Sequence, residues 1–148
     1  MITYLGMTAP MALFSLVAWL RNPFEENKSE VAVSSISFCE GIFAAVLTVG
    51  VTVAFYFILE AFDTANIIPS TVSVTTSFAA AYLTFRRSPW FAVWYAANDV
   101  VLIVLWILAS KTDVSYVSVV ICFVMFLFND LYGFINWRRM ERRQKGVC

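Results

Sequence analysis

The stretch from Ser115 to Trp137 reads SYVSVVICFVMFLFNDLYGFINW and continues directly into the basic sequence RRMERRQK. The hydrocarbon core of a bilayer is about 30 Å thick, so a helix that rises about 1.5 Å per residue needs roughly 20 apolar residues to cross it. Residues 115–128 of this stretch carry no charge. The pattern therefore predicts a membrane-spanning helix that ends in positive charge.

Polar side chains gather near the far end of this predicted helix, where Asn129, Asp130 and Asn136 are interleaved with Tyr132 and Trp137. A carboxylate at the centre of a bilayer costs about 2.5 to 3.5 kcal/mol on insertion scales, so such groups normally face a bundle interior or a wet cavity. We expect these side chains to have protein or ligand partners, as in a transporter helix.

The composition of the whole chain supports the same class. Of the 148 residues, 61 % are hydrophobic and 17 % are aromatic, and the mean hydropathy is +0.78. These values are typical of membrane proteins and unlike those of soluble domains. The sequence contains no histidine, no nucleophile triad, no phosphate-binding loop and no metal-ligand spacing, so we expect neither enzyme activity nor a cofactor or metal.

Five segments reach membrane length, and we expect an all-α polytopic membrane protein with one membrane domain over residues 1–148. The predicted helices are residues 2–20, 41–59, 67–85, 90–109 and 114–137, with a polar loop at 21–38 and a basic tail at 138–148. The third segment is rich in hydroxyl groups, so we expect it to be buried among the other helices. The three cysteines, Cys39, Cys122 and Cys148, are predicted to be unpaired thiols.

The basic residues fall almost entirely on one side of this threaded chain. Lys111 is the single basic residue on the opposite side, and the other nine are Arg21, Lys28, Arg86, Arg87, Arg138, Arg139, Arg142, Arg143 and Lys145. Positive charge marks the cytoplasmic side of membrane proteins. The sequence therefore predicts a cytoplasmic C-terminus and an N-terminus outside the cell.

An internal echo links the first and last segments. FSLVAWLR, Phe14 to Arg21, and YGFINWRR, Tyr132 to Arg139, share an aromatic residue, a tryptophan and an arginine at the same spacing. The echo is what a parallel repeat would produce, with the chain arranged as 1 + 1 + 3 helices. The alternative is that both tryptophan and arginine pairs are ordinary interfacial anchors.

Two polar and aromatic stripes are predicted to face each other. Trp90, Trp94 and Asn98 lie at i, i+4 and i+8, and Asn129, Tyr132 and Asn136 lie at i, i+3 and i+7. Facing each other across a short loop, they would form a pocket for a flat, polar or cationic ring. Alternatively, the aromatics are belt residues and the amides join helices. We expect Asp99 and Asp130 to be structural hydrogen-bonding groups, with a proton or cation relay as the alternative.

Long parts of the sequence resemble one family. RRSPWFAVWYAANDVVLIVLW, NDLYGFINWRRMERRQ and VTVAFYFILEAFDTANIIPSTVSVTTSFAAAYLTFRRSP look like the C-terminal half of the PnuC family of bacterial nicotinamide riboside transporters. The resemblance covers nearly all of the chain. It is carried by the joint pattern and not by any single motif.

The resemblance implies a seven-helix 3 + 1 + 3 fold in the bacterial plasma membrane, assembled as a homotrimer in the lipid bilayer. It also implies facilitated diffusion of nicotinamide riboside, with no nucleic-acid partner. The matching ligand-binding positions are Trp94, Asn98, Asn129 and Tyr132, with Asn136 and Asp130 behind them. The chain begins at what would be the family's third helix, so an N-terminally truncated form is expected.

Three alternatives remain open from the residues alone. The first is a non-transporting membrane interaction protein or remnant. The second is a small ion-coupled exporter that uses Asp99 or Asp130. The third is a transporter of the mononucleotide or of another planar vitamin such as thiamine or riboflavin, because relatives of similar architecture differ in few pocket residues.

Overall fold

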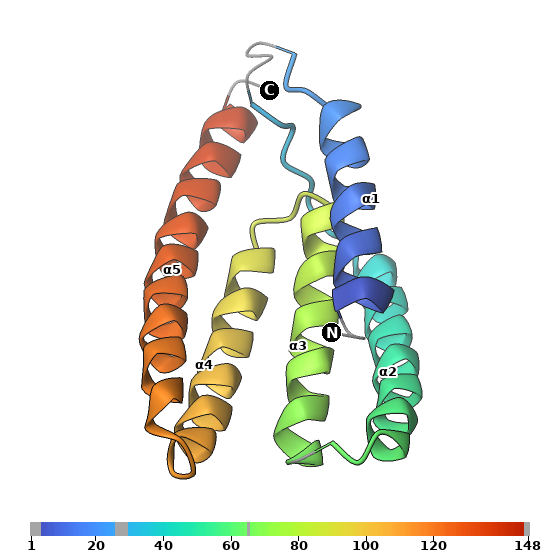
Figure 1. Ribbon diagram of the computed structural model, residues 1–148. Helices are drawn as coiled ribbons and strands as arrows, with labels where there is room; N and C mark the ends of the chain where they lie inside the picture. The colour runs from blue at the N-terminus through green and yellow to red at the C-terminus, as the bar shows by residue number, and fades with distance from the viewer. Residues whose placement is uncertain (1–3, 26–29, 65, 147–148) are drawn as a thin grey trace.

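The computed structural model describes residues 4–25, 30–64 and 66–146, and Figure 1 shows helices that run up and down beside one another. The predicted residues Lys28 and Cys148 and the start of the first segment lie outside the described residues. The elements are a π-helix η1 (Tyr4–Thr8), α1 (Ala9–Leu20), α2 (Phe38–Ala61), α3 (Ile67–Phe85), α4 (Phe91–Ser110), a 3₁₀ turn η2 (Val114–Tyr116) and α5 (Val117–Gly146). The prediction of an all-α protein with five main helices is confirmed.

Three helical stretches are long and apolar enough to cross a membrane, judged by length and composition: α2, α4 and the run from Val114 to Gly146. The apolar helix from Gly6 to Leu20 is shorter. The helix α3 has 19 residues but is less apolar, because it contains many serine and threonine residues.

The helix α3 lies in the middle of the bundle, in contact with α1, α2 and α4 (Figure 1). Several of its hydroxyl groups are satisfied within the helix, since Thr71 donates to Ile67 O at 2.8 Å and Thr84 donates to Ala80 O at 2.9 Å. Its small residues Ala79, Ala80 and Ala81 are buried and allow close helix approach. The expectation that the third segment is buried among helices is confirmed.

The helix α5 continues beyond the predicted end at residue 137 and reaches Gly146. Its 30 residues correspond to about 45 Å of helix. The basic tail is therefore the last part of a helix. Glu141 stabilises this part, since it accepts a hydrogen bond from Arg138 at 2.5 Å and one from Lys145 at 2.8 Å, three and four residues away.

A short loop joins α3 to α4 and sets where α4 begins. Ser88 N donates to Leu83 O and Arg87 N donates to Thr84 O, both at 3.0 Å, which is the hydrogen-bond pattern of a Schellman cap. Arg87 adopts φ 56°, the left-handed conformation that glycine usually takes in such caps. Ser88 and Pro89 are buried, so the loop is a fixed corner.

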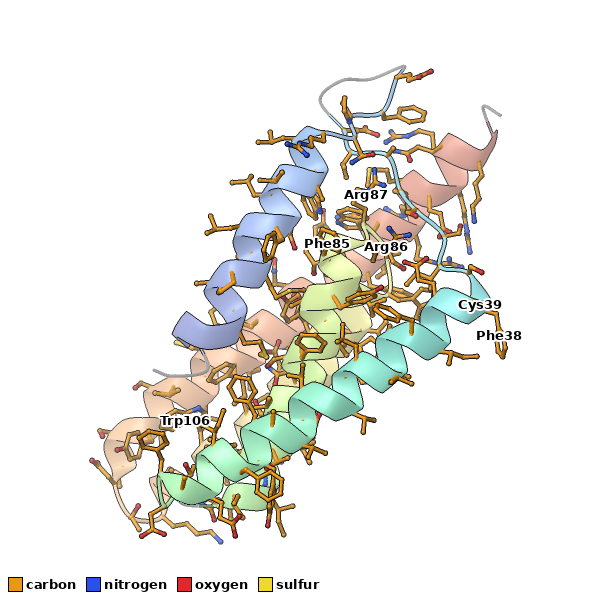
Figure 2. The ribbon with its side chains drawn as sticks, turned by 90° about the vertical axis from the view of Figure 1, so that its right-hand side faces the viewer. Phe38, Cys39, Phe85, Arg86, Arg87 and Trp106 are labelled. Carbon is orange, nitrogen blue, oxygen red and sulfur yellow. The ribbon has the colours of Figure 1, made fainter. Side chains whose placement is uncertain are left out.

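The described basic residues other than Lys111 gather at one end of the bundle. Figure 2 shows Arg86 and Arg87 at the end opposite Trp106. The segment between α1 and α2 crosses this end: Ser34 N donates to Arg87 O at 3.2 Å, and Arg143 donates to Glu30 at 2.6 Å. This agrees with the predicted threading of the chain, while the side of the membrane stays a prediction.

Candidate ligand-binding site

The interface between α4 and α5 differs from the predicted one. The ring centroids of Trp90 and Phe134 are 5.7 Å apart, those of Phe91 and Trp137 are 5.1 Å apart, and the carboxyl group of Asp130 approaches that of Asp99. Residues 130, 134 and 137 share one face of α5 by helical spacing. This face, and not the predicted stripe, packs against α4.

The predicted stripe on α5 lies largely away from α4. Asn129 is exposed, Tyr132 is 65 % exposed and Asn136 is half-buried. The expectation that this stripe faces Trp94 and Asn98 is therefore wrong. The physical reason is that α5 has apolar residues around its whole circumference, and the aromatic rings of Phe134 and Trp137 fill the interface instead.

Asn98 is buried at the contact between α3 and α4, with 7 % of its surface exposed. Its Oδ1 atom accepts hydrogen bonds from Ser73 Oγ at 2.8 Å and from Thr76 Oγ1 at 3.0 Å. Interhelical bonds of this kind contribute about 0.6 to 2 kcal/mol each within a bilayer. Asn98 therefore joins two helices and holds the part of α4 that carries Trp94.

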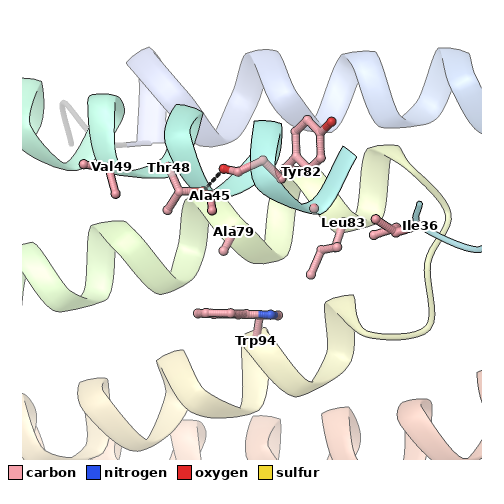
Figure 3. Close-up of a pocket in the computed structure, with 10 residues that line it drawn as sticks. Ile36, Ala45, Thr48, Val49, Ala79, Tyr82, Leu83 and Trp94 are labelled. Carbon is pink, nitrogen blue, oxygen red and sulfur yellow. Dashed lines mark hydrogen bonds between the residues drawn. The ribbon is translucent and has the colours of Figure 1, made fainter. Parts of the chain in front are cut away.

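Trp94 lines a cavity of about 360 Å³ between α2, α3 and α4. Figure 3 shows its indole ring lying across the cavity from Ala79 and Leu83, with Thr48 on the wall formed by α2. The indole is 40 % exposed, so its surface is accessible from this cavity. The cavity is mostly apolar, and Thr48 and Tyr82 are its polar lining residues.

The side of this cavity that α2 forms was not predicted from the sequence. It consists of small residues at i, i+3, i+4 and i+7, namely Gly41, Ala44, Ala45 and Thr48. This spacing places all four on one helix face and leaves room between α2 and its neighbours. A search for small residues at helical spacing would have found the wall.

A second cavity, of about 280 Å³, lies between α1, α3 and α4 and is bounded by Ser15, Trp19 and Tyr95. Trp19 Nε1 donates to Thr84 O at 2.9 Å, and its ring centroid lies 5.3 Å from that of Trp137. The two tryptophans of the sequence echo are therefore in contact. The parallel repeat itself stays a prediction.

A third hollow, of about 420 Å³, follows the outer face of α5 at the basic end and is lined by Asn136, Arg139, Met140 and Arg143. Asn136 is thus separated from the cavity at Trp94. Arg143 also forms the ion pair with Glu30 that holds the segment between α1 and α2. The six predicted site residues are therefore distributed over several surfaces.

The basic end carries further charge contacts. Arg86 forms an ion pair with Glu40, and the guanidinium carbon of Arg138 lies 5.8 Å from the ring centroid of Trp90. Burial lowers the pKa of the Arg87 guanidinium, and the neighbouring charge of Arg86 adds to this effect. Trp90 is exposed beside these charges, as the interfacial interpretation of this residue requires.

Trp94 presents its indole ring to the cavity between α2, α3 and α4. A Trp face attracts cations and stacks on flat rings.

Within the described residues, no group of three or more histidine, cysteine, aspartate or glutamate side chains could hold a metal ion. Cys39 and Cys122 are free and exposed.

Comparisons with known proteins agree on one family. The family model described as nicotinamide mononucleotide transporter matches residues 1–139. A nicotinamide riboside transporter PnuC of Neisseria mucosa is 33 % identical over 78 residues, which cover 51 % of this chain and 29 % of that protein. A crystal structure of the vitamin B3 transporter PnuC superposes with a TM-score of 0.78 at 21 % identity, covering 97 % of this chain and 63 % of that one. The chain thus spans under a third of the first protein and under two-thirds of the second.

Proposed function

Because the chain belongs to the nicotinamide mononucleotide transporter family, we propose that it moves nicotinamide riboside, or its mononucleotide, across a bacterial plasma membrane. The observation that carries this proposal is the extent of the family match, since residues 1–139 include α1 to α4 and most of α5. The orientation that we propose places the C-terminus in the cytoplasm, as the basic end of the bundle supports.

The proposed ligand contact begins at Trp94. A nicotinamide ring linked to ribose carries a delocalised positive charge, and stacking on an indole contributes about 0.5 to 2 kcal/mol, depending on desolvation. The cavity of about 360 Å³ at Trp94 lies within the range of about 300 to 1,000 Å³ that is typical of small-molecule sites. Asn98 acts one helical turn away as a positioning residue, because its hydrogen bonds hold α4 against α3.

Asn129, Tyr132 and Asn136 form a second proposed contact surface, with Asp130 behind it. The amides can donate to and accept from a carboxamide or ribose hydroxyls, and Tyr132 offers an exposed ring. Asn129 and Tyr132 are uncovered, which leaves this face of α5 open to a ligand or to another helix. The trimer implied by the family resemblance is part of the same proposal.

The test is binding and uptake of labelled nicotinamide riboside, with Trp94→Ala as the main variant. We expect purified Trp94→Ala to bind at least about tenfold more weakly, equivalent to about 1.4 kcal/mol, and Trp94→Phe to retain part of the affinity. Trp106→Ala is the matched control, because Trp106 lies near the other end of α4, away from the cavity at Trp94. Its ring packs on Tyr116, with ring centroids 5.1 Å apart. Equal loss in Trp94→Ala and Trp106→Ala would contradict the assignment of the site.

Uptake is measured in cells that lack their own transporter, with and without an uncoupler. Facilitated diffusion predicts that early uptake is unaffected by the uncoupler. Loss of uptake on uncoupling would instead support the ion-coupled alternative. Competition by unlabelled mononucleotide, thiamine and riboflavin identifies the preferred substrate.

A second candidate function is association with another membrane helix. The observation that favours it is Asn129, an amide that is exposed on α5 directly after the apolar run of residues 119–128. In a bilayer such an amide normally finds a partner on a neighbouring helix. Co-purification with a tagged full-length relative, reduced by Asn129→Leu, would support this function, and unchanged capture by the variant would contradict it.

A further inference from the structure

Two carboxyl groups meet in the interface between α4 and α5. Asp99 lies near the middle of α4 and is buried, with 6 % of its surface exposed, and the carboxyl group of Asp130 approaches it from α5. Asp99 Oδ2 is buried and receives no hydrogen bond from any N–H or O–H group that the structure describes. The carboxyl group of Asp130 is thus the polar group on α5 that interacts with Asp99.

Among the residues that the structure describes, no lysine or arginine forms an ion pair with Asp99 or Asp130. The helices α3 and α4 contain no lysine or arginine, and Lys111 follows Asp99 by about 18 Å of helix rise. On α5 the first basic residue is Arg138, about 12 Å beyond Asp130, and it is engaged with Glu141 and Trp90. The last part of α5 carries Arg139, Glu141, Arg142, Arg143 and Lys145, farther from Asp130 than Arg138 is along the helix. The other titratable groups on the elements packed here are Tyr82 on α3, Tyr95 on α4, Cys122 and Tyr132 on α5 and Tyr116 in η2.

Two ionised carboxylates in contact repel each other strongly in a medium of low dielectric constant, so a close pair without a counter-ion retains a proton. The proton completes the hydrogen bond, because a carboxylate can only accept and a protonated carboxyl group can donate. A bond between a carboxylic acid and a carboxylate is also among the stronger hydrogen bonds in proteins. The geometry of the pair thus requires a donor that only a bound proton can supply.

We propose that Asp99 and Asp130 form a proton-binding site, in which one shared proton joins α4 to α5. Loss of this proton leaves two adjacent negative charges and separates the helices that carry Trp94 and the Asn129 stripe. The site therefore makes the packing of α4 against α5 dependent on pH. This inference is independent of which ligand the protein transports.

The sign of the effect follows from counting protons. In the unfolded chain both carboxyl groups are ionised near neutral pH, whereas the folded pair holds one proton. The folded state therefore binds more protons, and stability falls as pH rises. For one proton, the unfolding equilibrium constant increases about tenfold per pH unit while the folded pair retains it.

The experiment follows unfolding of the purified chain in detergent from about pH 5 to about pH 9, for the wild type and Asp130→Asn. We expect the wild type to lose stability as pH rises. We expect Asp130→Asn to lose this dependence, because the amide donates to Asp99 without a shared proton. Asp113→Asn is the control: the Ser115 backbone N–H holds the pKa of the exposed Asp113 below its usual range, so this group stays ionised throughout. Asp113→Asn should therefore behave like the wild type.

Two further measurements keep the proposal falsifiable if Asp130→Asn folds poorly. Asp99→Asn should remove the same pH dependence, and the infrared band of a protonated carboxyl group should be present in the wild type and absent from either variant. Equal pH dependence in the wild type and a folded variant would overturn the proposal. Stabilisation of the wild type alone by sodium chloride, relative to choline chloride, would overturn it in favour of a metal-cation site.

Discussion

The helices α3 and α5 both carry several polar side chains, but α3 lies in the middle of the bundle and α5 lies at its edge. The helix α3 contacts α1, α2 and α4, and several of its hydroxyl groups, such as those of Thr71 and Thr84, donate to carbonyl groups of its own preceding turn. The helix α5 packs mainly on α4, and Asn129 and Tyr132 remain exposed. Hydroxyl groups can satisfy themselves within a helix, whereas amides require a partner from elsewhere. The kind of polar group therefore distinguishes a structural helix from one that presents a binding surface.

The largest expected effect tests the tight packing of α3. Ala80 is 0 % exposed, so Ala80→Leu forces a large side chain into the centre of the bundle. We expect a loss of about 3 kcal/mol in unfolding free energy, measured in mixed detergent micelles. Cys122→Leu on the exposed surface of α5 is the matched control and should change stability by less than about 0.5 kcal/mol. Similar losses in both variants would remove the contrast between the helices.

Intermediate effects on stability and binding are expected for Asn98 and Asn129, the two asparagines that were predicted to lie on facing stripes of α4 and α5. Asn98→Leu removes the acceptor of Ser73 and Thr76 and should destabilise the protein by about 1 to 2 kcal/mol. Asn129→Leu should leave stability nearly unchanged and weaken binding of nicotinamide riboside. Thermal unfolding with and without ligand separates these outcomes. A larger stability loss in Asn129→Leu would show that α5 is covered within this chain.

The smallest effect concerns the hydroxyl contact between α2 and α3. Thr52 Oγ1 and Thr75 Oγ1 are 2.9 Å apart, so Thr75→Val should cost about 0.6 kcal/mol. Thr71→Val is its control, since the Thr71 hydroxyl donates to Ile67 O in the same helix. A double-mutant cycle with Thr52→Val isolates the contact between the two hydroxyl groups. A coupling energy of zero would mean that α3 is held by close packing alone.

Helix positions were predictable where local chemistry marks both ends. The predicted third helix at 67–85 coincides with α3, because the Arg86–Pro89 corner and the left-handed Asn66 bound it. The end of α5 was placed nine residues too early. Hydropathy indicates where the apolar, membrane-spanning part of a helix ends. The helix itself can continue beyond that point, and here the side-chain hydrogen bond from Lys145 to Glu141 stabilises its last turns.

The candidate site was predictable only in part. Helical spacing correctly grouped Asn129 with Tyr132, and the structure leaves both of them on exposed positions of α5. Spacing could not tell which face of α5 turns inward, because apolar residues surround the helix and packing decides between them. The role of Asn98 depended on Ser73 and Thr76, residues 25 and 22 positions away, whose approach is set by the tertiary fold.

Gln144 behaves like a peptide group carried on a side chain. Its Oε1 atom accepts from Val33 N at 2.8 Å and its Nε2 atom donates to Val31 O at 3.1 Å, as a neighbouring β-strand would. The two partners are separated from Gln144 by 111 and 113 residues. During synthesis, these two hydrogen bonds cannot form until the far end of α5 has left the ribosome. The contact between α5 and the segment before α2, at the basic end of the bundle, is therefore completed only after all the helices have been synthesised.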